Sequence, residues 1–186
     1  MKILVINAGS SSIKYQLMDI EDVHHCTLLA SGLVEKIGEP VGRITHKTFQ
    51  GSSEHKFVEE GPLPTHHEGM SRLVALLTDT QKGVIRDAAE IHGVGHRVLS
   101  CGEVYSDTVR VTPKVKETIR EFFPLGPLHN PPNLMGIEVA EEFFPNAPQV
   151  AVFDTAFHQT MPPKAFLYAV PYEWYTKFRL RKYGFH

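Results

Sequence analysis

The hydrophobic pattern of the first sixty residues is that of β-strands. Residues 2–8 are apolar on both faces, as in a central strand, and residues 13–18 alternate roughly with period two after a Gly-Ser-Ser-Ser turn. These two segments predict a β-hairpin. A third strand is predicted over residues 26–37, and the alternation in residues 43–49 and 55–59 predicts a second, more exposed hairpin.

Helical periodicity begins near residue 65 and then alternates with two further strands, predicted over residues 91–99 and 149–153. Helix-start signals precede four segments. They are Thr65 with Glu68 three residues on, Thr112 with Pro113, Asn130 with Pro131, and Pro171 before a helix ending at Phe178. This order predicts an α/β fold with a mixed five-stranded sheet and flanking helices, plus an extra β-hairpin.

Composition and charge argue against several classes of protein. The chain has 186 residues, 42% hydrophobic and 22% charged, which is typical of a soluble globular domain. Its net charge is −2, so the chain lacks the excess of basic residues that binds nucleic acid phosphates, and we expect no nucleic acid partner. One local basic cluster is expected to be a solvated helix end. It consists of Lys177, Arg179, Arg181 and Lys182.

The cysteines, the N-terminus and the histidines bear on compartment and metal binding. Cys26 and Cys101 form no CxxC pattern and are expected to be reduced thiols of a cytosolic protein. The apolar run over residues 3–6 is too short for a signal peptide and no window reaches membrane-spanning length, so we expect a cytoplasmic protein without a membrane partner. The eleven histidines show no zinc-ligand spacing, which favours surface or core histidines over a metal site.

The turn of the first hairpin carries the first residues suited to ligand chemistry. In residues 7–14 (NAGSSSIK) the glycine allows a ligand close to the backbone, and turn amides, hydroxyls and a lysine suit phosphoryl oxygens. The segment is neither a Walker A loop nor a GxSxG elbow. A plain serine-rich turn explains the composition equally well, so both interpretations stay open from the residues alone.

An arginine stands in the strand predicted over residues 91–99. Residues 92–99 (HGVGHRVL) include two glycines, which indicates that another group passes close by. Arg97 lies between apolar neighbours and should point towards one face, where its planar fork matches a carboxylate or a phosphate. The alternative is an ordinary strand arginine in a surface ion pair.

Three further segments carry residues suited to ligand binding or catalysis: a loop that precedes a helix, the residue after a buried strand, and the end of the chain. In residues 127–133 (PLHNPPN) a helix N-terminus favours an anion and His129 adds a donor, although capping by Asn130 explains the sequence as well. Asp154 follows a buried strand, where α/β proteins place catalytic groups and metal-bound waters; a helix cap is the plain alternative. The run RKYGFH over residues 181–186 is an unusual end for a domain, so further residues are expected.

Five motifs taken together resemble those of the acetate kinase family in order and spacing. They are VINAGSSSIKY, GHRVLSCGE, PLHNPPN, FDTAFHQTMP and RKYGFH. The resemblance implies a ribonuclease H-like (actin-like ATPase) fold and reversible, direct in-line phosphoryl transfer from ATP to acetate, giving acetyl phosphate and ADP. It also implies that residues 1–186 are a single N-terminal domain, that the second, nucleotide-binding domain is absent from this chain, and that the full-length protein is a homodimer. The isolated chain is therefore expected to be inactive.

The resemblance also implies roles for individual residues. The expected catalytic residues are Arg97, Asp154 and His186. The expected substrate-binding residues are Arg97, Leu99, Leu128, His129 and Phe185. ATP or ADP, as co-substrate, is expected to contact Ser10, Ser12 and Lys14, and the metal ion (Mg²⁺, or Mn²⁺ in its place) Asn7 and Asp154.

Two positions depart from the family pattern. Cys101 stands where the family has a glycine, so the turn after Arg97 is expected to differ. Leu99 replaces a valine, and one extra methylene discriminates between substrates by ~1–3 kcal/mol, which favours acetate over propionate. The alternatives are a propionate or butyrate kinase and a non-catalytic actin-like binding module.

Overall fold

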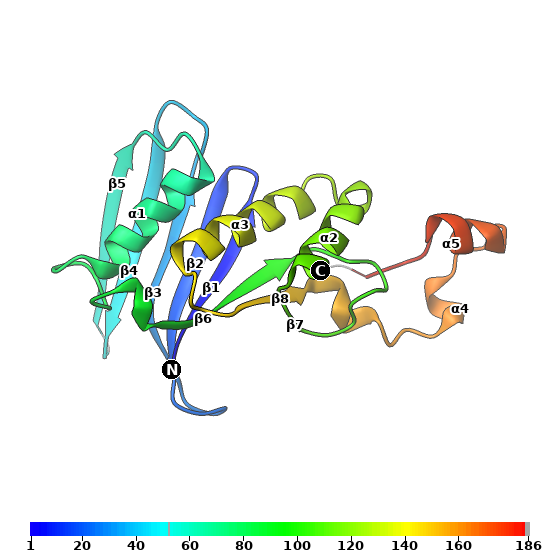
Figure 1. Ribbon diagram of the computed structural model, residues 1–186, viewed down its shortest axis with the longest axis horizontal. Helices are drawn as coiled ribbons and strands as arrows, with labels where there is room; N and C mark the ends of the chain where they lie inside the picture. The colour runs from blue at the N-terminus through cyan, green and yellow to red at the C-terminus, as the bar shows by residue number, and fades with distance from the viewer. Residues whose placement is uncertain (52, 185–186) are drawn as a thin grey trace.

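The structure, a computed structural model, describes residues 1–51 and 53–184 and builds this part of the chain around one eight-stranded sheet (Figure 1). The strand order is β5-β4-β3-β2-β1-β6-β8-β7. Within the run from β1 to β5 each pair of adjacent strands is antiparallel, while β6 is parallel to both β1 and β8, and β7 is antiparallel to β8. The bounds are β1 Lys2–Gly9, β2 Ser12–Ile20, β3 Cys26–Glu35, β4 Gly42–Gln50, β5 Ser53–Gly61, β6 Ile91–Val98, β7 Val109–Arg110 and β8 Gln149–Phe153.

The predicted α/β class with a mixed sheet and flanking helices is confirmed, but the sheet has eight strands among the described residues instead of five. The five predicted strands are β3, β2, β1, β6 and β8. The extra hairpin is not a separate unit, because residues 30–35 of β3 pair with residues 43–48 of β4 and continue the same sheet. Strand β7 was not predicted, since two residues carry no periodic signal.

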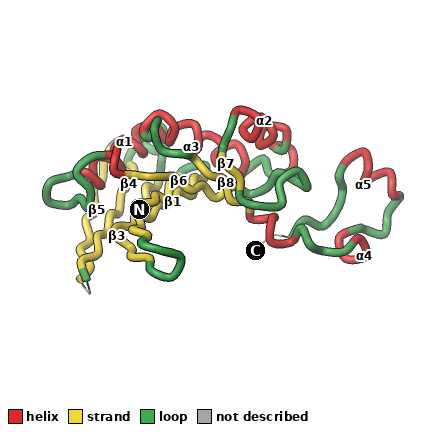
Figure 2. The backbone as a smooth tube through the Cα atoms, turned by 60° about the horizontal axis from the view of Figure 1, so that its bottom comes forward, coloured by secondary structure: helices red, strands yellow, loops and turns green. Residues whose placement is uncertain are grey.

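The long helices lie along one face of the sheet (Figure 2). They are α1 His66–Thr78, α2 Pro113–Glu121 and α3 Asn130–Phe143, with 3₁₀ turns at Ala88–Glu90, Phe123–Leu125 and Asp154–His158. The short helices α4 Pro163–Phe166 and α5 Tyr172–Phe178 project beyond the side of the sheet that ends with β8 and β7 (Figure 1). Within the described residues, no helix combines the length and the apolar character needed to cross a membrane.

Alternate residues of the central strands face these helices and form the core. Leu4 and Ile6 of β1 are fully buried and share one cluster with Met70, Leu73 and Leu77 of α1. Burying such a side chain contributes about 1.5–3 kcal/mol. A second cluster lies beneath α2 and α3 and includes Val98, Val115, Ile119, Leu134, Ile137, Ala151 and Phe153.

Two of the predicted helix starts are confirmed in atomic detail. The hydroxyl of Thr65 accepts a hydrogen bond from the backbone N–H of Glu68 at 3.4 Å, as an N-cap does, and it also donates to the Glu68 carboxylate. Thr112 accepts from the backbone N–H of Val115 at 3.3 Å, and Pro113 occupies the first helical position. Local side-chain chemistry therefore decides where α1 and α2 begin.

The predicted capping role of Asn130 is wrong. The cap position of α3 is His129, and Asn130 lies inside the helix with its side chain fully buried. Its amide accepts from the N–H of Ser100 at 3.3 Å and donates to the carbonyls of Ser100 at 2.9 Å and Phe122 at 3.0 Å. These bonds to two loops satisfy more of the amide than a cap would, and they anchor the loop that follows β6.

The basic cluster is not uniformly a solvated helix end. Arg181 is 6% exposed, and its guanidinium carbon lies 3.7 Å from the centre of the Phe166 ring. Its Nη1 forms an ion pair with Glu103, in the loop between β6 and β7. The prediction failed for Arg181 because its partners are 15 and 78 residues away in sequence, where a local charge pattern gives no signal.

Candidate functional site

The carboxyl ends of the three parallel strands meet at one edge of the sheet. Ile6 of β1 lies opposite His96 of β6, and Val98 of β6 lies opposite Phe153 of β8. This register brings the ends of β1, β6 and β8 together, and with them Asn7, Arg97 and Asp154. In α/β proteins this edge is where ligands bind.

A cavity of ≈ 180 Å³ opens at this edge. Its wall consists of Asn7, Ala8, Gly9, Ser12, Lys14, Arg97, Leu99, His129 and Asn133. Six predicted site residues are therefore brought together, from three separate segments of the chain: residues 7–14, residues 97–99 and His129. Three others among the described residues are not on this wall: Ser10 is exposed in the turn, Leu128 is 76% exposed, and Asp154 pairs with Arg97 beside the cavity. Phe185 and His186 lie outside the described residues.

The side chains of Arg97 and Asp154 form a two-pronged ion pair beside the cavity. Nε of Arg97 lies 2.9 Å from both carboxylate oxygens of Asp154, and Nη2 lies 2.6 Å from Oδ2. The carboxylate does not cap the 3₁₀ turn that it opens, so the capping alternative for Asp154 is wrong. The ion-pair alternative for Arg97 describes a real contact, but one inside the site. The pair also shows that one edge of this guanidinium can donate two hydrogen bonds to a planar carboxylate.

The turn of the first hairpin is fixed from two sides. Nε2 of His66, at the start of α1, lies 2.7 Å from the carbonyl oxygen of Gly9 and donates to it, because a carbonyl can only accept. The N–H of Ile37 donates to the carbonyl of Ser11 at 3.0 Å. The turn is therefore held in place before any ligand arrives, and Ser12 and Lys14 with it.

The turn after Arg97 has Gly102, not Cys101, in the left-handed region, with φ of +59°. Cys101 is fully buried in the second core cluster, and burial raises the pKa of its thiol to about 12. The thiol is therefore protonated and inert at neutral pH. Cys101 therefore contributes to core packing and is not part of the cavity wall.

Sequence reasoning missed Asn133, which also lies on the cavity wall. It is 7% exposed, and its side chain bonds to the backbone at the ends of β1 and β6. An asparagine in the first turn of a helix is typical of local capping, so sequence alone does not single it out. The one available signal was its place in the PLHNPPN motif beside His129.

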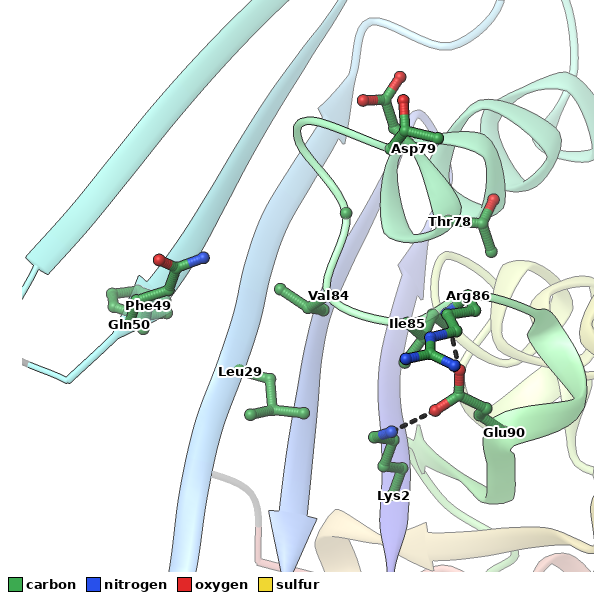
Figure 3. A pocket seen from close by; sticks show the side chains of 12 residues that line it. Lys2, Leu29, Phe49, Gln50, Thr78, Asp79, Val84, Ile85, Arg86 and Glu90 are labelled. Atoms are coloured by element: carbon green, nitrogen blue, oxygen red, sulfur yellow. Dashed lines mark hydrogen bonds and ion pairs between the residues drawn. The ribbon is translucent and has the colours of Figure 1, made fainter.

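A larger hollow of ≈ 860 Å³ lies at the opposite end of β1, next to Lys2 (Figure 3). Two of its charged side chains, Lys2 and Glu90, are already paired with each other. The Glu90 carboxylate also accepts the backbone N–H of Arg86 at 2.7 Å. Size alone therefore does not mark the functional site, and the smaller cavity at the carboxyl edge carries the convergent chemistry.

The donors around the cavity suit a hard divalent cation. Asn7 offers an amide oxygen and Asp154 a carboxylate, the ligand types that Mg²⁺ takes beside water and phosphate oxygens. Among the described residues, no three histidine, cysteine or acidic side chains gather as a metal cage would require. The residues present fit a cation that is held mainly by a bound phosphate.

Comparison with known proteins agrees with this geometry. The model of the acetokinase family matches residues 2–186. The chain belongs to the acetokinase family. It is 57% identical over 187 residues to the acetate kinase of Desulfovibrio desulfuricans, covering all of this chain and 46% of that protein.

Two solved structures of the family match the whole chain. The crystal structure of Porphyromonas gingivalis acetate kinase is 41% identical with a TM-score of 0.91, and that of a propionate kinase from Francisella tularensis subsp. tularensis is 37% identical with a TM-score of 0.87. Each match covers 100% of this chain and 45% of the other. The expected actin-like ATPase fold is thereby confirmed, and the chain spans somewhat under half the length of these relatives.

Proposed function

We propose that this domain forms the carboxylate- and phosphoryl-binding side of an acetate kinase active site. The reaction is transfer of the γ-phosphoryl group of ATP to acetate, giving acetyl phosphate and ADP. The observation that carries the proposal is the convergence of Arg97 with Asn7, Ser12, Lys14 and His129 in one cavity at the carboxyl edge of the sheet. Family membership supports acetate as the acceptor.

The chemistry needs positioning and charge compensation more than proton transfer. A carboxylate oxygen of acetate forms a new bond to the γ-phosphorus while the bond from that phosphorus to the bridging oxygen of ADP breaks. Acetate is ionised at neutral pH, so no proton has to be removed from the nucleophile. Negative charge on the equatorial oxygens is compensated by the cations of Arg97 and Lys14 and by a hydrogen bond from His129.

Asp154 prepares Arg97 for this task. Because the carboxylate binds both Nε and Nη2, it fixes the plane of the guanidinium group before substrate enters. A preset group loses little freedom on binding and needs no reorganisation in the transition state. In this proposal Mg²⁺, when bound, shields the phosphate charges, with Asn7 and Asp154 holding it; Mn²⁺ accepts the same oxygen ligands.

Propionate kinase is the second candidate, because a solved propionate kinase shares the fold over the whole chain. Leu99 lines the cavity and packs so closely on Gly126 that a Cβ on that glycine would lie 2.5 Å from Cδ2 of the leucine. The leucine cannot retreat in that direction, which favours the smaller acid. Comparison of kcat/KM for acetate, propionate and butyrate decides between them, and a higher value for propionate would assign the second candidate.

The role of Arg97 is tested in a polypeptide that joins this domain to the second half found in its relatives. We expect Arg97→Ala to lower kcat at least about a hundredfold, since an arginine on the transferring phosphoryl group supplies ~10³–10⁵ in rate. The matched control is Arg86→Ala, an exposed arginine at the other end of the sheet. Near-wild-type kcat in Arg97→Ala would remove the proposed role. The 186-residue chain by itself should form no acetyl phosphate that hydroxylamine could trap as acetyl hydroxamate.

A further inference from the structure

Asn133 connects two walls of the cavity that strand pairing leaves unconnected. Its Nδ2 donates to the carbonyl of Ala8 at 2.8 Å, and its Oδ1 accepts from the N–H of Leu99 at 3.0 Å. Ala8 directly follows Asn7, and Leu99 is two residues beyond Arg97. One side-chain amide therefore joins the metal- and phosphate-binding side of the cavity to the arginine side.

The position of this link matters because β1 and β6 no longer pair there. Their parallel register runs from Lys2 opposite Ile91 to Ile6 opposite His96 and stops. Beyond that point the ends of β1 and β6, which carry the site residues, are not joined by backbone hydrogen bonds of strand pairing. The amide of Asn133 has the donor and acceptor of a peptide group, so it replaces the missing backbone link at this point.

Helix α3 holds this amide rigidly against the end of β1. Asn133 is 7% exposed, which leaves its side chain little freedom. One turn later Gly136 allows the helix so close to β1 that an added Cβ would lie 2.4 Å from the Cβ of Ala8. Asn130, one turn earlier, bonds Ser100 and Phe122 but no residue of β1. Among these three positions, only the side chain of Asn133 forms hydrogen bonds to both strand ends.

We propose that Asn133 is a positioning residue, which sets the separation between Asn7 and Arg97 and so the width of the cavity. This inference rests on the proposed phosphoryl transfer. Groups on opposite sides of a transferring phosphoryl group must be held to a fraction of an ångström, and a 1 Å misplacement costs on the order of a hundredfold in rate. Asn133 touches no reacting atom in this scheme and acts through the two backbones it joins.

The decisive variant is Asn133→Asp, made in the two-domain polypeptide. The carboxylate keeps the acceptor for the N–H of Leu99 but loses the donor to the carbonyl of Ala8, so one half of the link is broken at constant side-chain size. We expect kcat to fall by about tenfold to a hundredfold, while KM for acetate changes by less than about threefold. Asn133→Leu, which removes both bonds, should lower kcat by at least as much.

The matched control is Asn130→Asp, the same substitution one turn earlier at a fully buried asparagine. It removes the donors to Ser100 and Phe122, so it should lower the unfolding temperature at least as much as Asn133→Asp. Its kcat should stay within about threefold of wild type, since it does not join the two strand ends. An equal loss of kcat in both variants would show a general loosening of α3 and would overturn the positioning role.

A measurement on the 186-residue chain separates this inference from the proposed activity. Hydrogen exchange at the Leu99 amide should stay slow in Asn133→Asp, which keeps that acceptor, and become at least about tenfold faster in Asn133→Leu. Equal protection in both variants would overturn the link. If the link is present but wild-type two-domain protein phosphorylates neither acetate nor propionate, the proposed function fails instead.

Discussion

Buried histidines have dedicated partners in this domain, and their neutral forms are part of the fold. Nε2 of His46 donates to the carbonyl of Lys82 at 3.0 Å, so Nδ1 is free to accept the hydroxyl of Tyr15 at 2.6 Å. His96 lies 2.7 Å from the side-chain oxygen of Gln149. Burial lowers the pKa of both His46 and His96, that of His96 to about 4.

The buried His96 should make stability depend on pH. The pKa of His96 is about 4 in the folded domain, against 6.5 for an exposed histidine such as that of the unfolded chain. Between pH 4 and pH 6.5 the unfolded chain therefore binds more protons than the folded one. The contribution of His96, on the order of 3 kcal/mol, is complete above pH 6.5 and is lost as the pH falls towards 4. Urea unfolding at several pH values should show that the free energy of unfolding changes less steeply with pH in His96→Leu than in wild type. The exposed His55→Leu should keep the wild-type slope, and an unchanged slope in His96→Leu would contradict the prediction.

At the residue scale, the sequence predicts chemistry better than it predicts contacts. Arg97 and His129 were predicted because their side chains suit phosphate and carboxylate, and Asn7 was predicted from the family resemblance; all three lie on one wall of the cavity. Asn133 and Arg181 were missed because their partners come from distant segments, which no local pattern reveals. Gly32 of β3 likewise makes room for a distant partner, since a Cβ there would lie 2.4 Å from the hydroxyl oxygen of Tyr15.

At the scale of elements, helix α3 has a sequence that trades helix propensity for contact. Gly136 is central in the helix, where alanine is ordinarily favoured by about 1 kcal/mol. Gly136 lies at the contact with Ala8 of β1, and Ala8 is part of the cavity wall. Helix starts at Thr65 and Thr112 followed from sequence, because capping is local. The pairing of β3 with β4 did not, because a strand's alternation shows its exposed face and not its neighbour.

Gly136→Ala should therefore destabilise the domain although alanine is the better helix former. The new methyl group would meet the Cβ of Ala8 at 2.4 Å, and overpacking of this kind costs about 1–3 kcal/mol. Gly69→Ala in α1 is the matched control: its nearest neighbours are tips of the Ile37 and Val34 side chains at 3.3 Å, which can shift. Denaturant unfolding should show the larger loss for Gly136→Ala. A gain in stability there would mean that α3 is free to move away from β1.

At the scale of the whole molecule, the domain consists of a covered sheet and an arm, defined here as residues 163–183, which projects from its edge (Figures 1 and 2). The arm exposes large apolar side chains that include Tyr172, Trp174 and Phe178. Glu103 ties it to the loop after β6, because the carboxylate accepts the hydroxyl of Tyr175 at 3.0 Å and pairs with Arg181. The arm is thus attached to the same loop that follows Arg97.

The Arg181–Glu103 pair should decide whether the arm stays docked. The Arg181 side chain is 3% exposed and stacks on Phe166, so removing its partner leaves a buried charge, at a cost of about 3–5 kcal/mol. In Arg181→Met and in Glu103→Gln, chymotrypsin should cut at the exposed aromatic residues of the arm at least about tenfold faster than in wild type, while the unfolding temperature of the sheet core changes little.

The double variant separates a pair from two independent contacts. Because either single change already breaks the ion pair, Arg181→Met combined with Glu103→Gln should be cut no faster than the worse single variant. Lys177→Met, an exposed lysine on α5, should be cut at the wild-type rate. Additive effects would mean that the hydrogen bond from Tyr175 to Glu103 holds the arm separately from the ion pair. The arm would then be attached through two independent contacts of Glu103, and the ion pair alone would not decide whether it stays docked.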